Sequence, residues 1–193
     1  MSQPRHEPLA HLALASAQAQ PEEAGATLQA LPYRPSVILR GESGDKAFPK
    51  AAAGGLGFDL PVAANHAAGD GGVTAYWLGP SEWQLLGLAD TEDLTQALAE
   101  TRHAIIENAD GQQAIALSGH RARDVLAKLC PLDLEDPGLV PGRCARTVLA
   151  GCTVLLVPRE DGAYHIHVAR SFADYVWRML AEAGSEFGVR VAQ

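Results

Sequence analysis

The sequence is short of cysteines, of long apolar runs and of basic charge. Its 193 residues include three cysteines, Cys130, Cys144 and Cys152, and no Cys-x-x-Cys pair. This usage favours buried, reduced thiols in a cytoplasmic protein over a disulfide framework or a metal site. No apolar run approaches the roughly eighteen residues that cross a bilayer, so no membrane partner is expected.

Basic residues are outnumbered by acidic ones. The sequence has 15 Lys and Arg residues and 23 Asp and Glu residues, which gives a formal net charge of −8. Nucleic-acid-binding surfaces are basic, so no nucleic-acid partner is expected. Arg121, Arg123 and Lys128 lie on or beside the polar face of one expected helix. That face is either solvated or a patch for an anion or an acidic partner.

Signatures of catalysis are also missing. Ser81, Ser118 and Ser171 lie outside any Gly-x-Ser-x-Gly motif, and Ser118 and Ser171 precede expected helices, where a hydroxyl caps free N–H groups. The glycine-rich runs at 54–57 and 69–72 match neither a dinucleotide-binding nor a Walker motif. We therefore assign no catalytic and no cofactor-binding residue.

Two histidines share one face of an expected strand. His165 and His167 would lie about 6.6 Å apart along it, but no third zinc ligand is near in the sequence. We assign no metal ligand and treat both as interface candidates. Trp177 joins them, because it stands beside the apolar stripe expected of its helix, formed by Phe172, Tyr175, Val176, Met179 and Leu180. Partial burial of Trp177 under the N-terminal tail is the alternative.

A composition of 47% hydrophobic and 20% charged residues indicates a globular chain. Within it, one pattern occurs twice. Leu39-Arg40-Gly41 and Leu117-Ser118-Gly119 each follow an apolar run, begin a helical stretch and precede a strand pair and a second helix. The duplication predicts an α+β fold of tandem βαββαβ (ferredoxin-like) units that share a core.

The duplication also divides the chain. We expect a mobile N-terminal arm at 1–33, or one that orders on a partner, then a first unit at 34–109 and a second at 110–193. Strands are expected at 36–39, 73–78, 83–88, 103–108, 113–117, 144–149, 152–157, 163–168 and 187–191. Helices are expected at 45–53, from Thr91 onward, between Ser118 and Pro131, and between Ser171 and Gly184, with an irregular loop at 54–72. Trp77 and Trp83 should face each other across a hairpin.

Several blocks resemble known families. The run 117–128 resembles the strand-to-helix signature of the aminomethyltransferase superfamily, with His120 where proline is common. More specifically, residues 35–183 resemble the gamma-subunit family of heterotetrameric sarcosine oxidases. The blocks that carry this resemblance are Leu39-Arg40-Gly41, Leu56-Gly57, Leu60-Pro61, Trp77-Leu78-Gly79-Pro80-Ser81-Glu82-Trp83, and the segments 130–134, 141–147 and 170–175.

The resemblance implies a non-catalytic gamma subunit with the aminomethyltransferase folate-binding-domain fold. Such a subunit supports assembly of a cytoplasmic oxidoreductase complex that demethylates sarcosine to glycine, with folate as one-carbon acceptor. It thus belongs to sarcosine catabolism and one-carbon metabolism. FAD, FMN, NAD and tetrahydrofolate are then expected on partner subunits and none on this chain, with alpha, beta and delta subunits as the partners.

Two other functions compete with this one. A stand-alone folate-binding, one-carbon transfer protein would need an acidic residue and aromatic walls around a pocket between the units; Asp110, Trp77 and Trp83 are the nearest candidates. An assembly chaperone like the related iron–sulfur maintenance proteins would carry a reactive cysteine in its own motif, which the sequence lacks.

Overall fold

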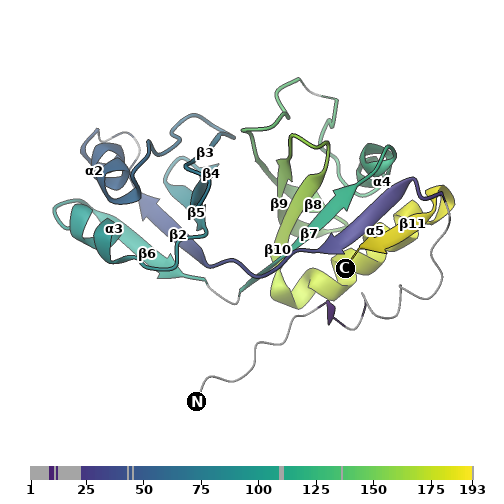
Figure 1. Cartoon of the computed structure of the whole chain (residues 1–193). Helices are drawn as coiled ribbons and strands as arrows, with labels where there is room; N and C mark the ends of the chain where they lie inside the picture. Colours follow the sequence, from purple (N-terminus) through teal and green to yellow (C-terminus); the bar gives the residue numbers. More distant parts are fainter. Residues whose placement is uncertain are drawn as a thin grey trace, which may run out of the picture. The chain divides into compact units, whose positions relative to one another are not determined.

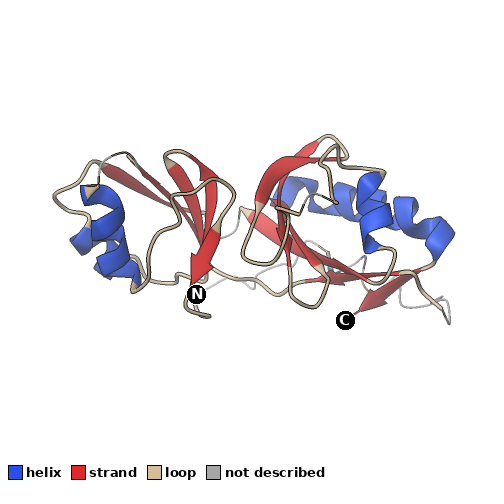
Figure 2. Ribbon diagram, turned by 90° about the horizontal axis from the view of Figure 1, so that it is seen from above, coloured by secondary structure: helices blue, strands red, loops and turns tan. Residues whose placement is uncertain are grey.

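The computed structural model describes residues 9–10, 12, 23–42, 44, 46–108, 111–135 and 137–192. It divides the chain into two units. The middle unit comprises residues 34–110 and 142–145, and the terminal unit comprises residues 1–33, 111–141 and 146–193. Each unit carries its helices on one face of its own sheet (Figure 2).

The middle unit has the βαββαβ order that the sequence predicts, with one short strand added. Its elements are β2 (Ser36–Gly41), α2 (Ala47–Leu56), β3 (Ala67–Gly69), β4 (Thr74–Gly79), β5 (Glu82–Leu86), α3 (Glu92–Ala97) and β6 (His103–Glu107) (Figure 1). The sheet order is β3-β4-β5-β2-β6, and all neighbours are antiparallel. This is the ferredoxin-like arrangement, in which the first strand lies between the third and the fourth.

Alternation along β2 sets the core of the middle unit. Val37 and Leu39 are buried, while Arg40 is exposed. The buried side chains of α2 recur at i, i+4 and i+8, from Phe48 to Leu56, as expected of an amphipathic helix. Phe48 packs on Trp83 with ring centroids 5.6 Å apart. The core therefore forms between one helix stripe and one sheet face.

The loop predicted at 54–72 is wrong at two places. Helix α2 continues through Gly54 and Gly55 to Leu56, and β3 pairs with β4. A Cβ on Gly55 would overlap the backbone of Leu94 in α3, so glycine here permits close packing of the two helices. Gly57 then ends α2 in the left-handed conformation, at φ 81°.

The terminal unit repeats the order around a longer sheet. Its strands are β1 (Ala26–Ala30), β7 (Gln112–Ser118), β8 (Ala145–Leu149), β9 (Cys152–Pro158), β10 (Tyr164–Ala169) and β11 (Val189–Ala192). Its helices are α4 (Ala122–Ala127) and α5 (Ala173–Gly184), with short 3-10 turns η1 (Arg170–Phe172) and η2 (Ser185–Phe187). The sheet order is β11-β1-β7-β10-β9-β8. The prediction of two βαββαβ units is thus confirmed.

Strand β1 contradicts the predicted arm. It lies between β11, to which it is parallel, and β7, to which it is antiparallel, and its Leu28 is fully buried. The predicted mobility at 1–33 is therefore wrong for residues 26–30, because their backbone groups bond to a strand on each side. Residues 1–8, 11 and 13–22 lie outside the described residues.

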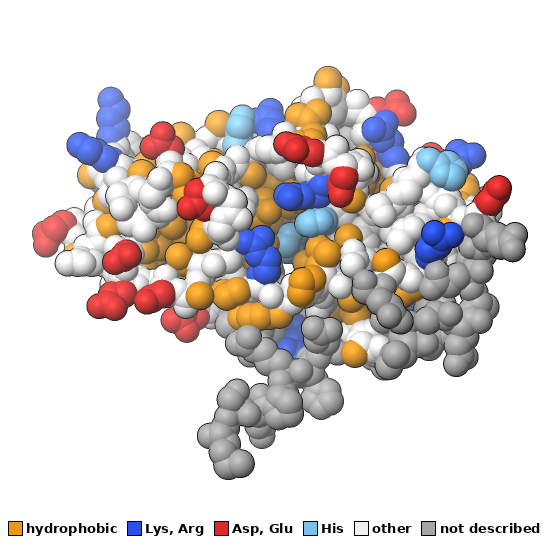
Figure 3. Space-filling model, viewed as in Figure 1, with side chains coloured by type: hydrophobic (Ala, Val, Ile, Leu, Met, Phe, Trp, Pro, Cys, Tyr) orange, Lys and Arg blue, Asp and Glu red, His pale blue; other side chains and the backbone are white. Residues whose placement is uncertain are grey.

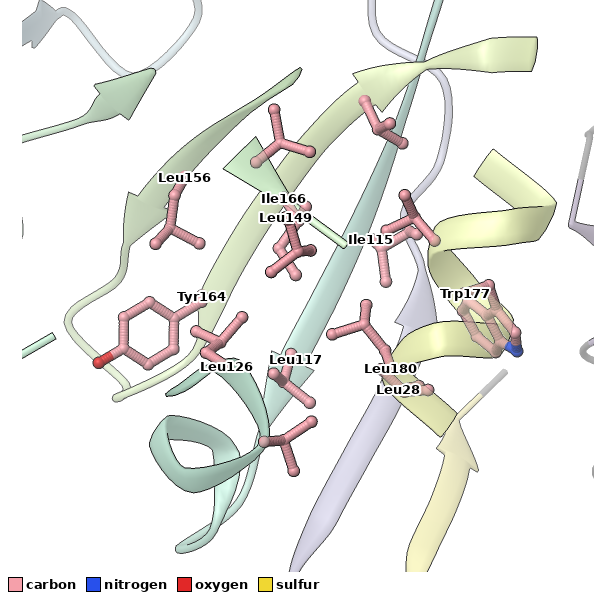
Figure 4. Packing of buried hydrophobic residues seen from close by; sticks show 14 of the residues in the cluster. Leu28, Ile115, Leu117, Leu126, Leu149, Leu156, Tyr164, Ile166, Trp177 and Leu180 are labelled. Carbon is pink, nitrogen blue, oxygen red and sulfur yellow. The ribbon is translucent and has the colours of Figure 1, made fainter. Parts of the chain in front are cut away.

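The core of the terminal unit lies between its sheet and the helices α4 and α5 (Figure 4). In α5, the buried residues Ala173, Val176, Trp177, Leu180 and Gly184 form one arc of the helix. A Cβ on Gly184 would meet Val189, so glycine lets β11 begin close to the end of the helix. Within the described residues, no helix is both long and apolar enough to cross a membrane.

Two predicted helix caps are also wrong. Helix α4 starts at Ala122 and α5 at Ala173, so Ser118 and Ser171 do not occupy the N-cap positions. Ser118 is instead the last residue of β7. At α3, the side-chain oxygen bonded to the first turn belongs to Asp90, which accepts from the Glu92 N–H at 2.9 Å.

Candidate functional site

Two of the three predicted interface residues are interior residues. Trp177 belongs to the core of the terminal unit (Figure 4) and is 2% exposed. His167 is 4% exposed. Both predictions are corrected, because a side chain enclosed by its own chain cannot meet a partner. His165 lies two residues earlier on β10 and is half-buried, so its role stays a prediction.

Two aromatic residues that the helix pattern placed inside are outside. Phe172 is 51% and Tyr175 45% exposed. Phe172 precedes the α-helix, in η1, where the 3.6-residue period does not apply. The Tyr175 hydroxyl donates to the Ala150 carbonyl at 3.1 Å, which holds its ring along the surface near the turn between β8 and β9.

The residues proposed for a folate pocket are not arranged as its walls. Trp83 is fully buried within the middle unit, and its Nε1–H donates to the Pro61 carbonyl at 2.6 Å. Trp77 pairs with Trp83 across β4 and β5, as predicted, and is half-buried against the same core. Asp110 lies outside the described residues. The tryptophans thus serve the interior of the middle unit.

A thiol, an imidazole and a guanidinium come together where residues 142–145 join the middle unit. Two backbone hydrogen bonds of 2.9 Å hold this segment, one from the Cys144 N–H to Asn65 and one from the Ala67 N–H to Gly142. The guanidinium of Arg143 contacts the His66 ring. The sequence offers no local signal for this cluster, because its two sides are 77 positions apart.

The Cys144 thiol in this cluster is held protonated. Burial raises its pKa to about 11, although the backbone of Trp77 and the nearby charge of Arg143 act in the opposite direction. The thiol sulfur lies 3.5 Å from the Trp77 carbonyl oxygen and 3.6 Å from that of His66. Because the nucleophile is the thiolate, the cluster is suited to holding a loop and not to covalent chemistry.

All three cysteines are buried and free of disulfides, as the sequence predicts. Among the described residues, no group of three or more His, Cys, Asp or Glu side chains could hold a metal ion.

The basic side chains at the two ends of α4, Arg121 and Lys128, make their contacts within the terminal unit. Lys128 donates to the Ala183 carbonyl at 2.6 Å, pairs with Glu186, and lies 4.5 Å from the ring centroid of Phe187. Arg121 lies 5.3 Å from the same centroid. A cation at the C-terminal end of α5 is favourable, so this predicted basic face stabilises the fold.

Charged side chains of both signs are scattered over the face shown in Figure 3, with apolar patches between them. Acidic side chains gather on the part of that face where Figure 1 places α3. Glu92 and Asp93 stand in the first turn of this helix, where carboxylates complement the helix dipole.

The chain matches known proteins along most of its length. The model of the sarcosine oxidase, gamma subunit family matches residues 40–186. The sarcosine oxidase subunit gamma of Corynebacterium sp. (strain P-1) is 30% identical over 95% of this chain and 91% of the relative. That of an Arthrobacter species is 32% identical with the same coverage.

Solved structures agree with these relatives. A chain of the heterotetrameric sarcosine oxidase from Corynebacterium sp. U-96, solved with pyrrole 2-carboxylate, has a TM-score of 0.85 at 30% identity, covering 95% of this chain and 96% of that one. The glycine cleavage system aminomethyltransferase T from Bartonella henselae has a TM-score of 0.69 at 14% identity, covering 96% of this chain and 58% of that one. At that identity, the second match concerns the fold alone.

Proposed function

Because the chain belongs to the sarcosine oxidase gamma subunit family, we propose that it is the gamma subunit of a heterotetrameric sarcosine oxidase and supports assembly of that complex without carrying its chemistry. The observation that carries the proposal is the match to gamma subunits over 95% of the chain and 91% of each relative.

The side chains of the middle unit support a non-catalytic role. The Cys144 thiol, in the cluster with His66 and Arg143, has its pKa raised to about 11, and Trp83 is buried in the core. The fold is shared with an aminomethyltransferase, but the fold by itself does not bring the reaction with it.

We further propose that alpha, beta and delta subunits are the partners of this chain in the cytoplasm. FAD, FMN, NAD and tetrahydrofolate would be bound by those subunits, and the assembled oxidoreductase would demethylate sarcosine to glycine with folate as the one-carbon acceptor. This chain would contribute a binding surface for the partner subunits. Of the predicted interface residues, His165 on β10 is the one that is half-buried and so partly accessible.

Purification of the native complex through a tag on this chain tests the proposal. We expect larger, flavin-coloured chains to co-elute in a fixed ratio, and the eluate to oxidise sarcosine. The separated chain should be colourless, should not turn sarcosine over, and should not bind tetrahydrofolate stoichiometrically. Turnover by the separated chain, or tight binding of a reduced folate to it, would contradict the proposal.

The role of His165 is tested in the same purification. His165→Ala should reduce the recovery of partner chains, whereas His120→Ala, at an exposed position before α4, should not. Equal recovery from both variants would remove His165 from the interface.

A further inference from the structure

The two edges of the sheet in the middle unit differ in how they are closed. The order β3-β4-β5-β2-β6 places β3 at one edge and β6 at the other. Residues 142–145 close the β3 edge: the Ala67 N–H donates to the Gly142 carbonyl at 2.9 Å, and His66 and Arg143 pair as a single antiparallel bridge. At β6, no described residue forms a ladder on the side away from β2.

The register of β6 shows which of its backbone groups point outward. Just after the strand, the Asn108 N–H donates to the Ser36 carbonyl at 2.9 Å, and these two residues lie directly opposite each other. Opposed residues of an antiparallel pair alternate between hydrogen-bonded and non-bonded pairs. Every second residue before Asn108 therefore bonds to β2, and the others turn their N–H and C=O groups outward. The outward residues are His103, Ile105 and Glu107.

Strand β6 lacks the features that commonly protect an exposed edge. Its sequence, His103-Ala104-Ile105-Ile106-Glu107, contains no proline and no lysine, and its register with β2 runs without a bulge. Ile106 is also 43% exposed. Edges of this kind pair readily with a strand of another chain, which is why natural proteins block them where no partner is intended.

The two faces of the sheet beside β6 call for different side chains in such a strand. Ile105 packs against the core cluster that contains Leu94 of α3, so it points to the face that the helices cover. Ile106 points to the opposite face, because side chains alternate along a strand. An added strand would therefore place apolar side chains beside Ile106 on that opposite face.

The helix-covered face calls for basic side chains. Between residues 89 and 108, Arg102 is outnumbered by exposed carboxylates. These belong to Asp90, Glu92, Asp93, Glu100 and Glu107. A second copy of this chain would bring like charges together at the edge, whereas a basic strand would complement them.

We propose that β6 is a docking edge, to which a partner subunit adds an extended segment as the next strand of this sheet. The segment alternates apolar side chains, beside Ile106, with basic side chains, beside the carboxylates of the helix-covered face. Main-chain hydrogen bonds to the outward groups of β6 hold it, as in other cases of strand addition. This inference rests on the proposed function, because it requires a partner chain.

Purification of the native complex through a tag on this chain tests the docking edge. Glu107→Pro removes an outward N–H, whereas the matched control Glu107→Ala removes the same carboxylate and keeps the N–H. We expect Glu107→Pro to recover about fivefold less partner chain than Glu107→Ala, because one main-chain hydrogen bond is lost. The two separated chains should have similar Tm values, since this N–H points away from β2.

The outcomes separate this proposal from the proposed function. If the parent chain recovers its partners and the two Glu107 variants recover them equally, the docking edge is overturned and the proposed function stands. A parent chain that recovers no partner would overturn both. Dimers of the separated chain that Glu107→Pro abolishes would also overturn the proposal, because the occupant would then be a second copy.

Charge reversal tests the same edge without changing the backbone, and it decides the question if Glu107→Pro does not fold. The double variant Glu100→Lys/Glu107→Lys should lower partner recovery about three- to tenfold. The control Glu160→Lys/Glu182→Lys makes the same change at exposed positions of the terminal unit and should leave recovery unchanged. Equal recovery from the two double variants would overturn the proposal.

Discussion

The two units have the same strand order but build it from the chain in different ways. In the middle unit, the order β6-β2-β5-β4 comes from one continuous stretch, 34–110. In the terminal unit, β11, β7, β10 and β9 hold the corresponding places, but β1 is inserted between the first two. Each sheet also ends in an extra edge strand, β3 or β8, which precedes the second strand of the repeat.

The units also fill their cores differently. Among the described residues, the largest buried side chain of the middle unit is Trp83, on a strand, and that of the terminal unit is Trp177, on a helix. The duplicated topology therefore does not require duplicated packing. What both units keep is a glycine at the end of the first strand of the repeat, the last residue of β2 (Gly41) or the residue after β7 (Gly119), because neither place has room for a Cβ.

The largest expected effects come from removing the two tryptophans. Trp83→Ala and Trp177→Ala should each lower the free energy of unfolding by about 3–5 kcal/mol, because each leaves a cavity in a closed core. Denaturant unfolding measures this. Trp83→Phe should recover most of the loss, apart from the hydrogen bond to Pro61. A loss below 1 kcal/mol for either tryptophan would show that its unit is not packed around it.

Substitution of Gly41 and of Gly119 should differ in whether a second substitution restores the lost stability. Gly41→Ala and Gly119→Ala should each cost about 1–3 kcal/mol, because the added Cβ has no room. At Gly41 the obstacle is the ring of Phe48, whereas at Gly119 it is the backbone of Gly25 and Ala26, and φ is +103°.

Phe48→Leu should therefore relieve Gly41→Ala but not Gly119→Ala. A double-mutant cycle measured by denaturant unfolding should give a coupling of at least about 0.5 kcal/mol at Gly41 and none at Gly119. Equal coupling at both glycines would erase this difference between the units.

Removal of one side-chain amide, that of Gln113, should weaken the attachment of the inserted strand β1. The Gln113 amide donates to the carbonyl of Leu31, just after β1, at 3.0 Å and to that of Ala114 at 2.8 Å. Gln113→Leu should cost about 0.5–1.5 kcal/mol in thermal unfolding. Hydrogen exchange should then speed up in β1 more than in β2. Faster exchange spread evenly over both units would contradict a local role.

The smallest effect at neutral pH is expected at Cys144. Its pKa is about 11 when folded, against an ordinary value of 9.0. The unfolded thiol therefore loses its proton first, and the stability that Cys144 contributes should fall as the pH rises from about 9 towards 11. In Cys144→Ser, the free energy of unfolding should fall less steeply between about pH 9 and pH 11, and at pH 7 it should stay nearly unchanged. Identical slopes in both proteins would contradict the raised pKa.

Local patterns in the sequence were enough to find most of the fold. Alternation located β10 within one residue, and apolar spacing located α5 up to its end at Gly184. Strand β1 escaped because Ala26-Thr27-Leu28-Gln29-Ala30 is only weakly apolar, and because its partners β7 and β11 are far along the chain. Such pairing leaves no periodic signal.

The site was harder to read than the fold. The inward and outward faces of α5 depend on where the helix begins, and a start at Ala173 left Phe172 outside it, while Trp177 lies within the buried arc. The contact of Arg143 with His66 joins two loops, and neither loop has a pattern that would reveal the other. The family resemblance came instead from blocks such as Trp77–Trp83, which combine turn residues with tryptophans.

The pairing of β1 with β11 has a consequence for biosynthesis. These strands are the first and the last among the described residues, yet they lie side by side in parallel. A ribosome releases the stretch from β2 to β6 early, so this part can collapse while translation continues. Strand β1 must wait until the codons of β11 are read before its outer edge is closed. A nascent chain stalled before Val189 would therefore contain a nearly complete middle unit and a terminal-unit sheet that lacks β11.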